Sequence, residues 1–161
     1  MDSNEQIAIS LLLWRRLVRQ LASRGRGRES GAFLLGRQDV PKRQVVDFIC
    51  YDDLDSRALN YGIVEFHRAG FSSLWTLCKE RQLHVLADAH THPTLDVRQS
   101  AVDKANPMIP VVGHVALILP SFGDTSGWSL SRVGIHRFLG QRRWQSFTAS
   151  DPDVPVRLTL W

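Results

Sequence analysis

Two histidines, two residues apart, are the clearest sign of chemistry in this sequence. His90 and His92 close the apolar run His84-Val-Leu-Ala-Asp-Ala-His90, which has the character of a β-strand. Because side chains alternate along a strand, both imidazoles leave the same face, about 6.5 to 7 Å apart along the chain. Two ring nitrogens can then bind one Zn²⁺ at about 2.0 to 2.1 Å, and Pro93 ends the strand beside them. The pair therefore predicts a metal site at the end of this strand.

Ser100 and Asp103 follow the two histidines at helical spacing. In a helix predicted over residues 99–105, positions three apart share one face, so both side chains can point at the same site. Asp103 is then the candidate third ligand. Two histidines and one carboxylate leave a fourth tetrahedral position for water, which is typical of catalytic rather than structural zinc.

A general base is expected close to that water, and Glu29 is the candidate. It stands just before the apolar run over residues 32–35, which ends at Gly36. Alone, an acid at this position is usually a solvated strand end, because glutamate is seldom buried without a partner. A nearby metal ion reverses that preference.

The remaining titratable residues give weaker signals. Asp88 shares the face of His90 by alternation, but we expect an unrelated polar role rather than support of the ligand. Four other histidines have no partner at ligand spacing and are expected to be ordinary core or surface residues: His67, His84, His114 and His136.

Hydrophobic periodicity predicts an α/β order of elements around these residues. An amphipathic helix is expected over residues 4–22, capped by Ser3, and a second over residues 66–81. Strands are expected at 32–35, 45–50, 84–90, 111–119, 129–138 and 143–147, the first two forming an antiparallel hairpin, with a loop over 52–62. The tail over 150–161 ends in Trp161 and predicts either an edge strand packed on the domain or a docking surface for a partner.

Length and composition are those of one soluble domain spanning residues 1–161. With 161 residues, of which 43% are hydrophobic, the chain can bury a core without disulfides or a structural metal. Cys50 and Cys78 lack paired spacing and are expected to be buried and reduced. The acidic start and the short apolar stretch over 7–14 match neither a secretory signal nor a membrane span, so we expect a cytoplasmic protein.

The formal net charge of +4 raises the question of nucleic-acid binding. Six arginines crowd the end of the first helix and the loop after it, where they could contact phosphates: Arg15, Arg16, Arg19, Arg24, Arg26 and Arg28. No aromatic residues interleave with them, so a solvated helix face is the favoured interpretation. Nucleic acid is therefore not the expected partner.

Together, the chemical residues resemble the JAMM motif of the MPN-plus zinc metalloproteases: Glu29 before an apolar strand, His90-Thr-His92-Pro93, and Ser100 three residues before Asp103. The resemblance covers roughly residues 5–148. It implies a single MPN-like domain in which a curved mixed β-sheet, flanked by the N-terminal helix and a central helix, carries the zinc site at its edge. It also implies one Zn²⁺ per chain bound by His90, His92 and Asp103, with Glu29 as the base and Ser100 as a donor to the oxyanion.

Members of this family hydrolyse the isopeptide or peptide bond after the C-terminal glycine of ubiquitin-like proteins. The resemblance therefore implies a metallo-isopeptidase acting on a ubiquitin-like protein with an extended glycine-containing tail, with E1-like and E2-like proteins of the same operon as further candidate partners. Larger members of the family carry insertions that bind ubiquitin at the places of segments 52–62 and 93–100, and both segments are short here. This favours a small modifier that is recognised through its tail by strand addition. Three alternatives stay open: trimming of a sulfur-carrier protein, a non-catalytic MPN scaffold, and a basic nucleic-acid-binding module.

Overall fold

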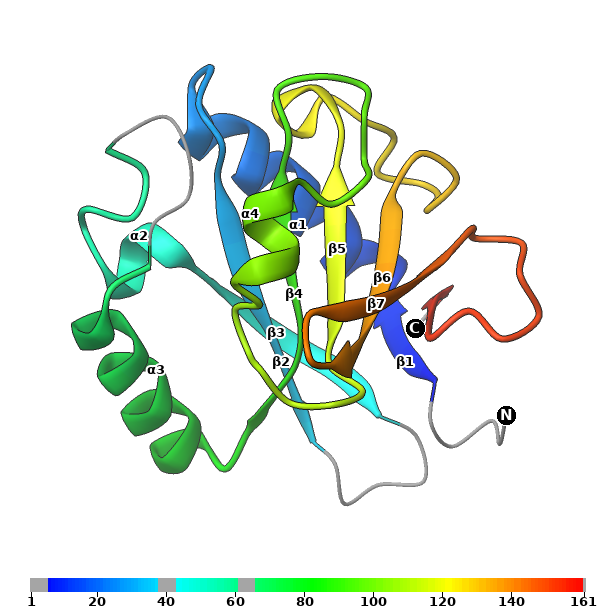
Figure 1. Ribbon diagram of the computed structural model, residues 1–161. Helices are drawn as coiled ribbons and strands as arrows, with labels where there is room; N and C mark the ends of the chain where they lie inside the picture. The colour runs from blue at the N-terminus through cyan, green and yellow to red at the C-terminus, as the bar shows by residue number, and fades with distance from the viewer. Residues whose placement is uncertain (1–5, 38–42, 61–65, 161) are drawn as a thin grey trace.

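One mixed β-sheet runs through the protein (Figure 1). The computed structural model describes residues 6–37, 43–60 and 66–160. The sheet has eight strands in the order β7-β6-β5-β4-β2-β3-β1-β8. Their bounds are β1 Ile7–Ser10, β2 Gly31–Arg37, β3 Gln44–Cys50, β4 His84–Thr91, β5 Val115–Leu119, β6 Gly134–Gly140, β7 Arg143–Phe147 and β8 Val156–Thr159. The central pair β4 and β5 is parallel, while β2 pairs antiparallel with both β3 and β4, so the predicted α/β class and the predicted β2–β3 hairpin are confirmed.

Helices cover both faces of the sheet. Helix α1 (Leu11–Gly25) lies behind it in Figure 1, and α4 (Ala101–Ala105) lies in front. The short α2 (Tyr51–Leu54), α3 (Arg68–Arg81) and a 3₁₀ turn over Ser121–Gly123 complete the set. Strand β2 is buried on both sides: Ala32 and Leu34 belong to the core that contains α1, whereas Phe33 and Leu35 belong to the core that contains α3. The alternation of a fully apolar strand thus creates two cores, one on each face.

The N-terminal prediction was wrong in one respect. Residues Ile7–Ser10 form a strand that pairs in parallel with both β3 and β8, and the helix begins only at Leu11. Ser10 caps that helix by accepting a hydrogen bond from the Leu13 backbone N–H, whereas the predicted cap, Ser3, lies outside the described residues. Pairing with a strand about 150 residues away in sequence overrides the local helical pattern, because Ile7 and Ile9 become fully buried between two neighbours.

Other boundaries move by a few residues. Strand β5 begins at Val115 rather than 111, β6 begins at Gly134 rather than 129, and the predicted loop after residue 51 opens with the single turn of α2. The tail forms β8 at the edge of the sheet, beside β1, as its edge-strand interpretation predicted, while Trp161 lies outside the described residues. Val154 and Val156 of this tail are buried in the core against α1, so the tail is part of the same domain core.

Two further sequence predictions concern cysteines and membranes. Cys50 and Cys78 are free and buried as expected, and burial raises the pKa of the Cys50 thiol to about 12, which makes it a poor nucleophile. Within the described ranges, no helix has the length and apolar character needed to cross a membrane.

Candidate metal centre

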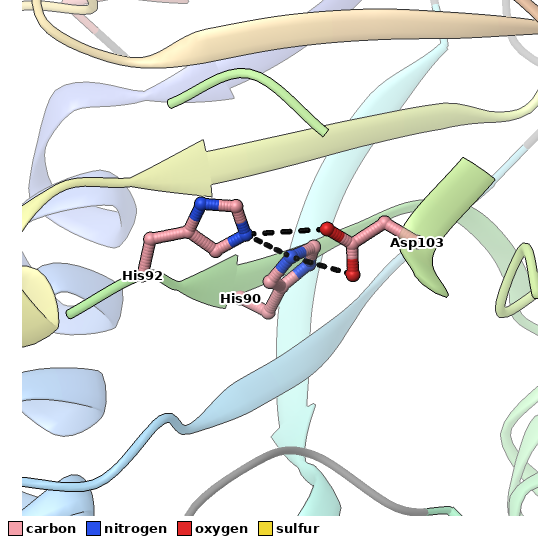
Figure 2. A group of neighbouring side chains, drawn as sticks. All are labelled: His90, His92 and Asp103. Atoms are coloured by element: carbon pink, nitrogen blue, oxygen red, sulfur yellow. Dashed lines mark hydrogen bonds and ion pairs between the residues drawn. The ribbon is translucent and has the colours of Figure 1, made fainter. Parts of the chain in front are cut away.

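Three side chains converge at the end of β4, as the sequence predicted (Figure 2). The Nε2 atoms of His90 and His92 lie 3.3 Å apart. Asp103 reaches both rings from α4, with Oδ2 at 3.3 Å from His92 Nε2 and Oδ1 at 3.6 Å from His90 Nε2. All three donor atoms lie within 4.8 Å of one another, so this group can hold a metal ion.

The separations suit a tetrahedral ion. With bonds of about 2.0 to 2.1 Å, two ligands of a tetrahedral centre stand about 3.3 to 3.4 Å apart, close to the distances of His92 Nε2 from His90 Nε2 and from Asp103 Oδ2. The position of the proton on the His92 ring is also compatible with metal binding. His92 Nδ1 lies 2.9 Å from the Asp96 carbonyl oxygen, which only accepts, so the proton is on Nδ1 and the Nε2 lone pair points at the cluster. A lone pair facing other acceptors is destabilising unless a proton or a cation lies between them.

The cluster also favours a bound proton on His92. The hydrogen bond to Asp103 raises the pKa of His92, although burial opposes the charge. Burial alone would raise the pKa of Asp103, but the two histidines and the Ser100 donors outweigh it and lower the pKa below its usual range. A proton and a metal ion therefore compete for the same lone pairs.

Helix capping holds Asp103 in place. Ser100 is the N-cap of α4: its hydroxyl oxygen accepts from the Asp103 backbone N–H at 3.1 Å, and its own backbone N–H donates to Asp103 Oδ2 at 2.7 Å. Ser100 and Asp103 thus form a capping box instead of sharing a helix face, which corrects the predicted geometry. The Ser-x-x-Asp spacing thus serves local structure and the orientation of the Asp103 carboxylate at once.

The cluster opens into a cavity of about 1090 Å³ that Glu29 and Ser100 also line. Glu29 is half-buried, and its charge contributes to raising the pKa of His92. Strand β2 begins two residues later at Gly31, which pairs with His90. A Cβ at Gly31 would lie 2.2 Å from the Tyr51 ring, so only glycine allows Tyr51 to pass behind the site. All five residues singled out by the sequence therefore face one cavity.

Behind His90 lies a buried polar group that the sequence did not predict. Asp88 Oδ1 is 2.6 Å from His114 Nε2, Tyr51 donates its hydroxyl to Asp88 Oδ2 at 3.3 Å, and that oxygen lies 3.8 Å from His90 Nδ1. Burial alone would raise the pKa of Asp88, but the two histidines lower it, so the carboxylate is ionised. Asp88 thus lies close enough to the His90 ring to influence it electrostatically, which favours support of the candidate ligand over the expected unrelated role, although neither role is tested by these contacts.

Two more of the four histidines without an assigned role also have defined contacts. His136 Nε2 donates to the Val97 carbonyl oxygen at 2.9 Å, which fastens the loop that carries the Asp96 acceptor of His92. His67 lines the cavity, with Nδ1 at 2.5 Å from a carboxylate oxygen of buried Asp55. These partners are 12 residues or more away along the chain, beyond any local spacing rule.

Four of the six clustered arginines make contacts with other residues of the protein. Arg24 pairs with Asp52 and Asp53 at 3.1 and 2.8 Å. Arg15 stacks on the Trp128 ring, Arg16 pairs with Asp47, and Arg28 donates to the Leu59 carbonyl oxygen. These contacts hold four of the six arginines, although the Arg16 side chain is still 52% exposed. The expectation that nucleic acid is not the partner stays a prediction.

Comparison with known proteins places the fold but not the chemistry. No family model matches the chain. A protein from Desulfitobacterium hafniense superimposes with a TM-score of 0.63 at 16% identity, over 96% of this chain and 93% of that one. A protein from Salinibacter ruber gives a TM-score of 0.57 at 17% identity, over 92% and 94%. At such low identity the likeness establishes a shared fold alone.

Proposed function

We propose that the protein is a zinc-dependent metallopeptidase that hydrolyses the peptide or isopeptide bond after the C-terminal glycine of a ubiquitin-like protein. One observation carries the proposal: the donor atoms of His90, His92 and Asp103 converge in a cavity whose lining also includes Glu29 and Ser100. This is the complete residue set of the JAMM motif that the sequence resembles. Bound Zn²⁺ would supply a Lewis acid that polarises a carbonyl group and increases the acidity of water at neutral pH.

Glu29 is suited to move the proton in this reaction. Hydrolysis adds the oxygen of water to the carbonyl carbon and a proton to the departing amine as the C–N bond breaks. A half-buried carboxylate that lines the cavity and influences His92 electrostatically can take the proton from water and return it to the amine. Both steps use the same group, so Glu29 ends each turnover as it began.

Ser100 is suited to stabilise the developing negative charge. Its oxygen is already engaged by the Asp103 backbone N–H, which fixes the hydroxyl at the start of α4. The hydroxyl hydrogen can then donate to the carbonyl oxygen as that oxygen becomes an anion. Because Ser100 also orients Asp103, replacing it with alanine affects both metal affinity and turnover, whereas replacement of Glu29 affects turnover alone.

The test uses the zinc-loaded protein and a ubiquitin-like protein encoded in the same operon, fused through its terminal glycine to a fluorescent protein. We expect cleavage after the glycine, and we expect Glu29→Gln to lower kcat by about 10²- to 10⁴-fold while zinc content stays the same. Substantial turnover by Glu29→Gln, or cleavage that survives complete chelation of zinc, would contradict the proposal. A ubiquitin-like sulfur carrier fused in the same way tests the trimming alternative with the same readout.

A further inference from the structure

The cavity is larger than the metal cluster and its catalytic pair require. At about 1090 Å³ it exceeds the roughly 300 to 1,000 Å³ of pockets that enclose whole small ligands. The terminal glycine itself has no side chain to fill such a space. The part of the cavity lined by Phe66, Phe71 and Met108, here called the aromatic arm, therefore needs another occupant.

The aromatic arm is apolar and already formed. Phe66 and Phe71 meet edge to face at 4.7 Å between ring centroids, and Phe66 also packs on buried Phe33 at 5.2 Å. Together with Met108, these residues are partly buried: they pack against the core that contains α3, and they also line the cavity. Rings fixed in this way offer apolar surface without any loss of side-chain freedom on binding.

A polar group stands beside the aromatic arm. Asp55 is buried and accepts backbone N–H bonds from Arg57 and His67 at 3.0 Å each. The same carboxylate lies against His67 Nδ1, which therefore carries the proton and donates it. The other ring nitrogen of His67, a residue that lines the cavity, is then left to accept a hydrogen bond from a bound molecule, such as the backbone N–H of a peptide.

Building on the proposed function, we propose that the aromatic arm binds a large apolar side chain of the residue that follows the scissile bond, with His67 accepting from that segment's backbone. The proposed reaction places glycine directly before the bond, so a bulky side chain next to the cleaved bond belongs to the leaving peptide. An isopeptide presents only the slim methylene chain of a lysine there. The preferred substrate is therefore a linear precursor in which the terminal glycine is followed by phenylalanine, leucine or a similar residue.

The first experiment compares synthetic peptides that are identical except for the residue after a Gly-Gly pair. With the zinc-loaded protein, we expect kcat/KM for phenylalanine or leucine to exceed that for glycine or for a lysine isopeptide by about 10-fold or more. Met108→Ala and Phe71→Ala should reduce this preference. Trp75→Ala, on α3 but 49% exposed and outside the cavity lining, should leave it unchanged. Equal rates for phenylalanine and glycine, or a preference for the isopeptide, would overturn the proposal.

The second experiment measures binding without turnover. The Glu29→Gln protein is titrated with N-acetyl-phenylalanine amide and with N-acetyl-glycine amide, and backbone amide shifts are followed by NMR. We expect the phenylalanine compound to bind about 10-fold more tightly and to shift the amides of residues 66–71 and Met108. Binding that is no tighter than for the glycine compound, or shifts elsewhere, would overturn the proposal. Failure of every peptide to be cleaved, with this binding intact, would instead count against the proposed reaction.

Discussion

The two faces of the sheet differ at the point where the candidate ligands meet. On the α1 side, charged groups find partners within the protein: Arg24 meets Asp52 and Asp53, and Arg16 meets Asp47. On the α4 side, His90, His92 and Asp103 bring acceptor atoms together at 3.3 to 3.6 Å. Acceptors that face one another call for a ligand from outside, whereas matched pairs do not. The candidate site is thus marked by acceptor atoms that face one another and not by the amount of charge.

Packing follows the same division. Helix α1 closes its face with fully buried side chains such as Trp14, Leu17 and Leu21. The opposite face leaves a cavity of about 1090 Å³ above β4 and its neighbours. Substitutions on the α1 face should therefore change stability and leave metal affinity intact, and substitutions in the cavity should do the reverse.

Asp103→Ala should have the largest effect. Removing one of the three candidate ligands, together with its capping contact, is expected to weaken Zn²⁺ binding by roughly 10³-fold or more. Titration against a chromophoric chelator measures the affinity. Asp96→Asn is the matched control, because Asp96 lies in the same segment but pairs with Arg98 through its side chain and contacts His92 only through its backbone. Tight zinc binding by Asp103→Ala would remove Asp103 from the site.

Trp14→Ala should produce the opposite result. Trp14 is fully buried against the sheet, so truncation should lower the free energy of unfolding by about 3 to 5 kcal/mol. Zinc affinity of the folded protein should not change. Trp14→Phe is the control: it keeps an aromatic ring and removes an indole N–H that has no partner among the described residues, so the loss should be clearly smaller. Urea unfolding of the metal-free protein measures both, and a concurrent loss of zinc affinity would contradict the division between the faces.

Local spacing explains how much of the site could be predicted. Strand alternation places His90 and His92 on one face, and both rules used for the site act within 15 residues. The spacing of Ser100 and Asp103 brought both to the site, but through a capping box and not through the predicted shared helix face. Local spacing could not place Glu29 at the site. Glu29 stands just before β2, and β2 meets β4 only in the folded sheet, through the Gly31–His90 pair. There the resemblance to a known motif supplied what periodicity lacks.

Contacts between distant residues explain what was missed. Strand β1 exists because Ile7 pairs with Val156 across nearly the whole chain, and no local pattern encodes that. The buried group around Asp88 joins it to His114 and Tyr51, which arrive from a neighbouring strand end and from α2. Alternation did place Asp88 on the face of His90, but whether such a residue reaches a ligand depends on what packs around it.

Asp88→Asn tests whether the charge of a buried residue behind His90 matters for zinc binding, because asparagine has nearly the same shape as aspartate. Asparagine replaces an ionised acceptor that faces His90 Nδ1 at 3.8 Å, so the ring should be less well oriented and less basic. We expect zinc affinity to fall by about 10- to 100-fold with little loss of fold. Asp55→Asn provides the control, because Asp55 is also buried beside a histidine but has no contact with a ligand. Equal effects of the two substitutions on zinc affinity would assign Asp88 a purely structural role.

Asp47→Asn should have the smallest effect, and it tests what the ion pairs of Asp47 with two arginines contribute to stability. Asp47 joins α1 to α3 by pairing with Arg16 at 2.5 Å and Arg81 at 2.9 Å. Burial alone would raise the pKa of Asp47, but the Phe48 backbone N–H and both arginines lower it below its ordinary value. A lowered carboxyl pKa contributes stability above the unfolded-state value of about 3.9, and this contribution disappears as the pH falls through the folded-state pKa.

The parent should therefore be more stable than Asp47→Asn by about 1 kcal/mol or less at pH 7, because the partly exposed pairs are screened by solvent. The difference should shrink below about pH 4 and in 1 M salt. Urea unfolding of the metal-free proteins at both pH values measures it. A loss of several kcal/mol, or one that persists at low pH, would mean that Asp47 acts through packing and not through its arginines. Increased affinity of the variant for a short DNA duplex would show, in turn, that this pairing is what keeps Arg16 from phosphate.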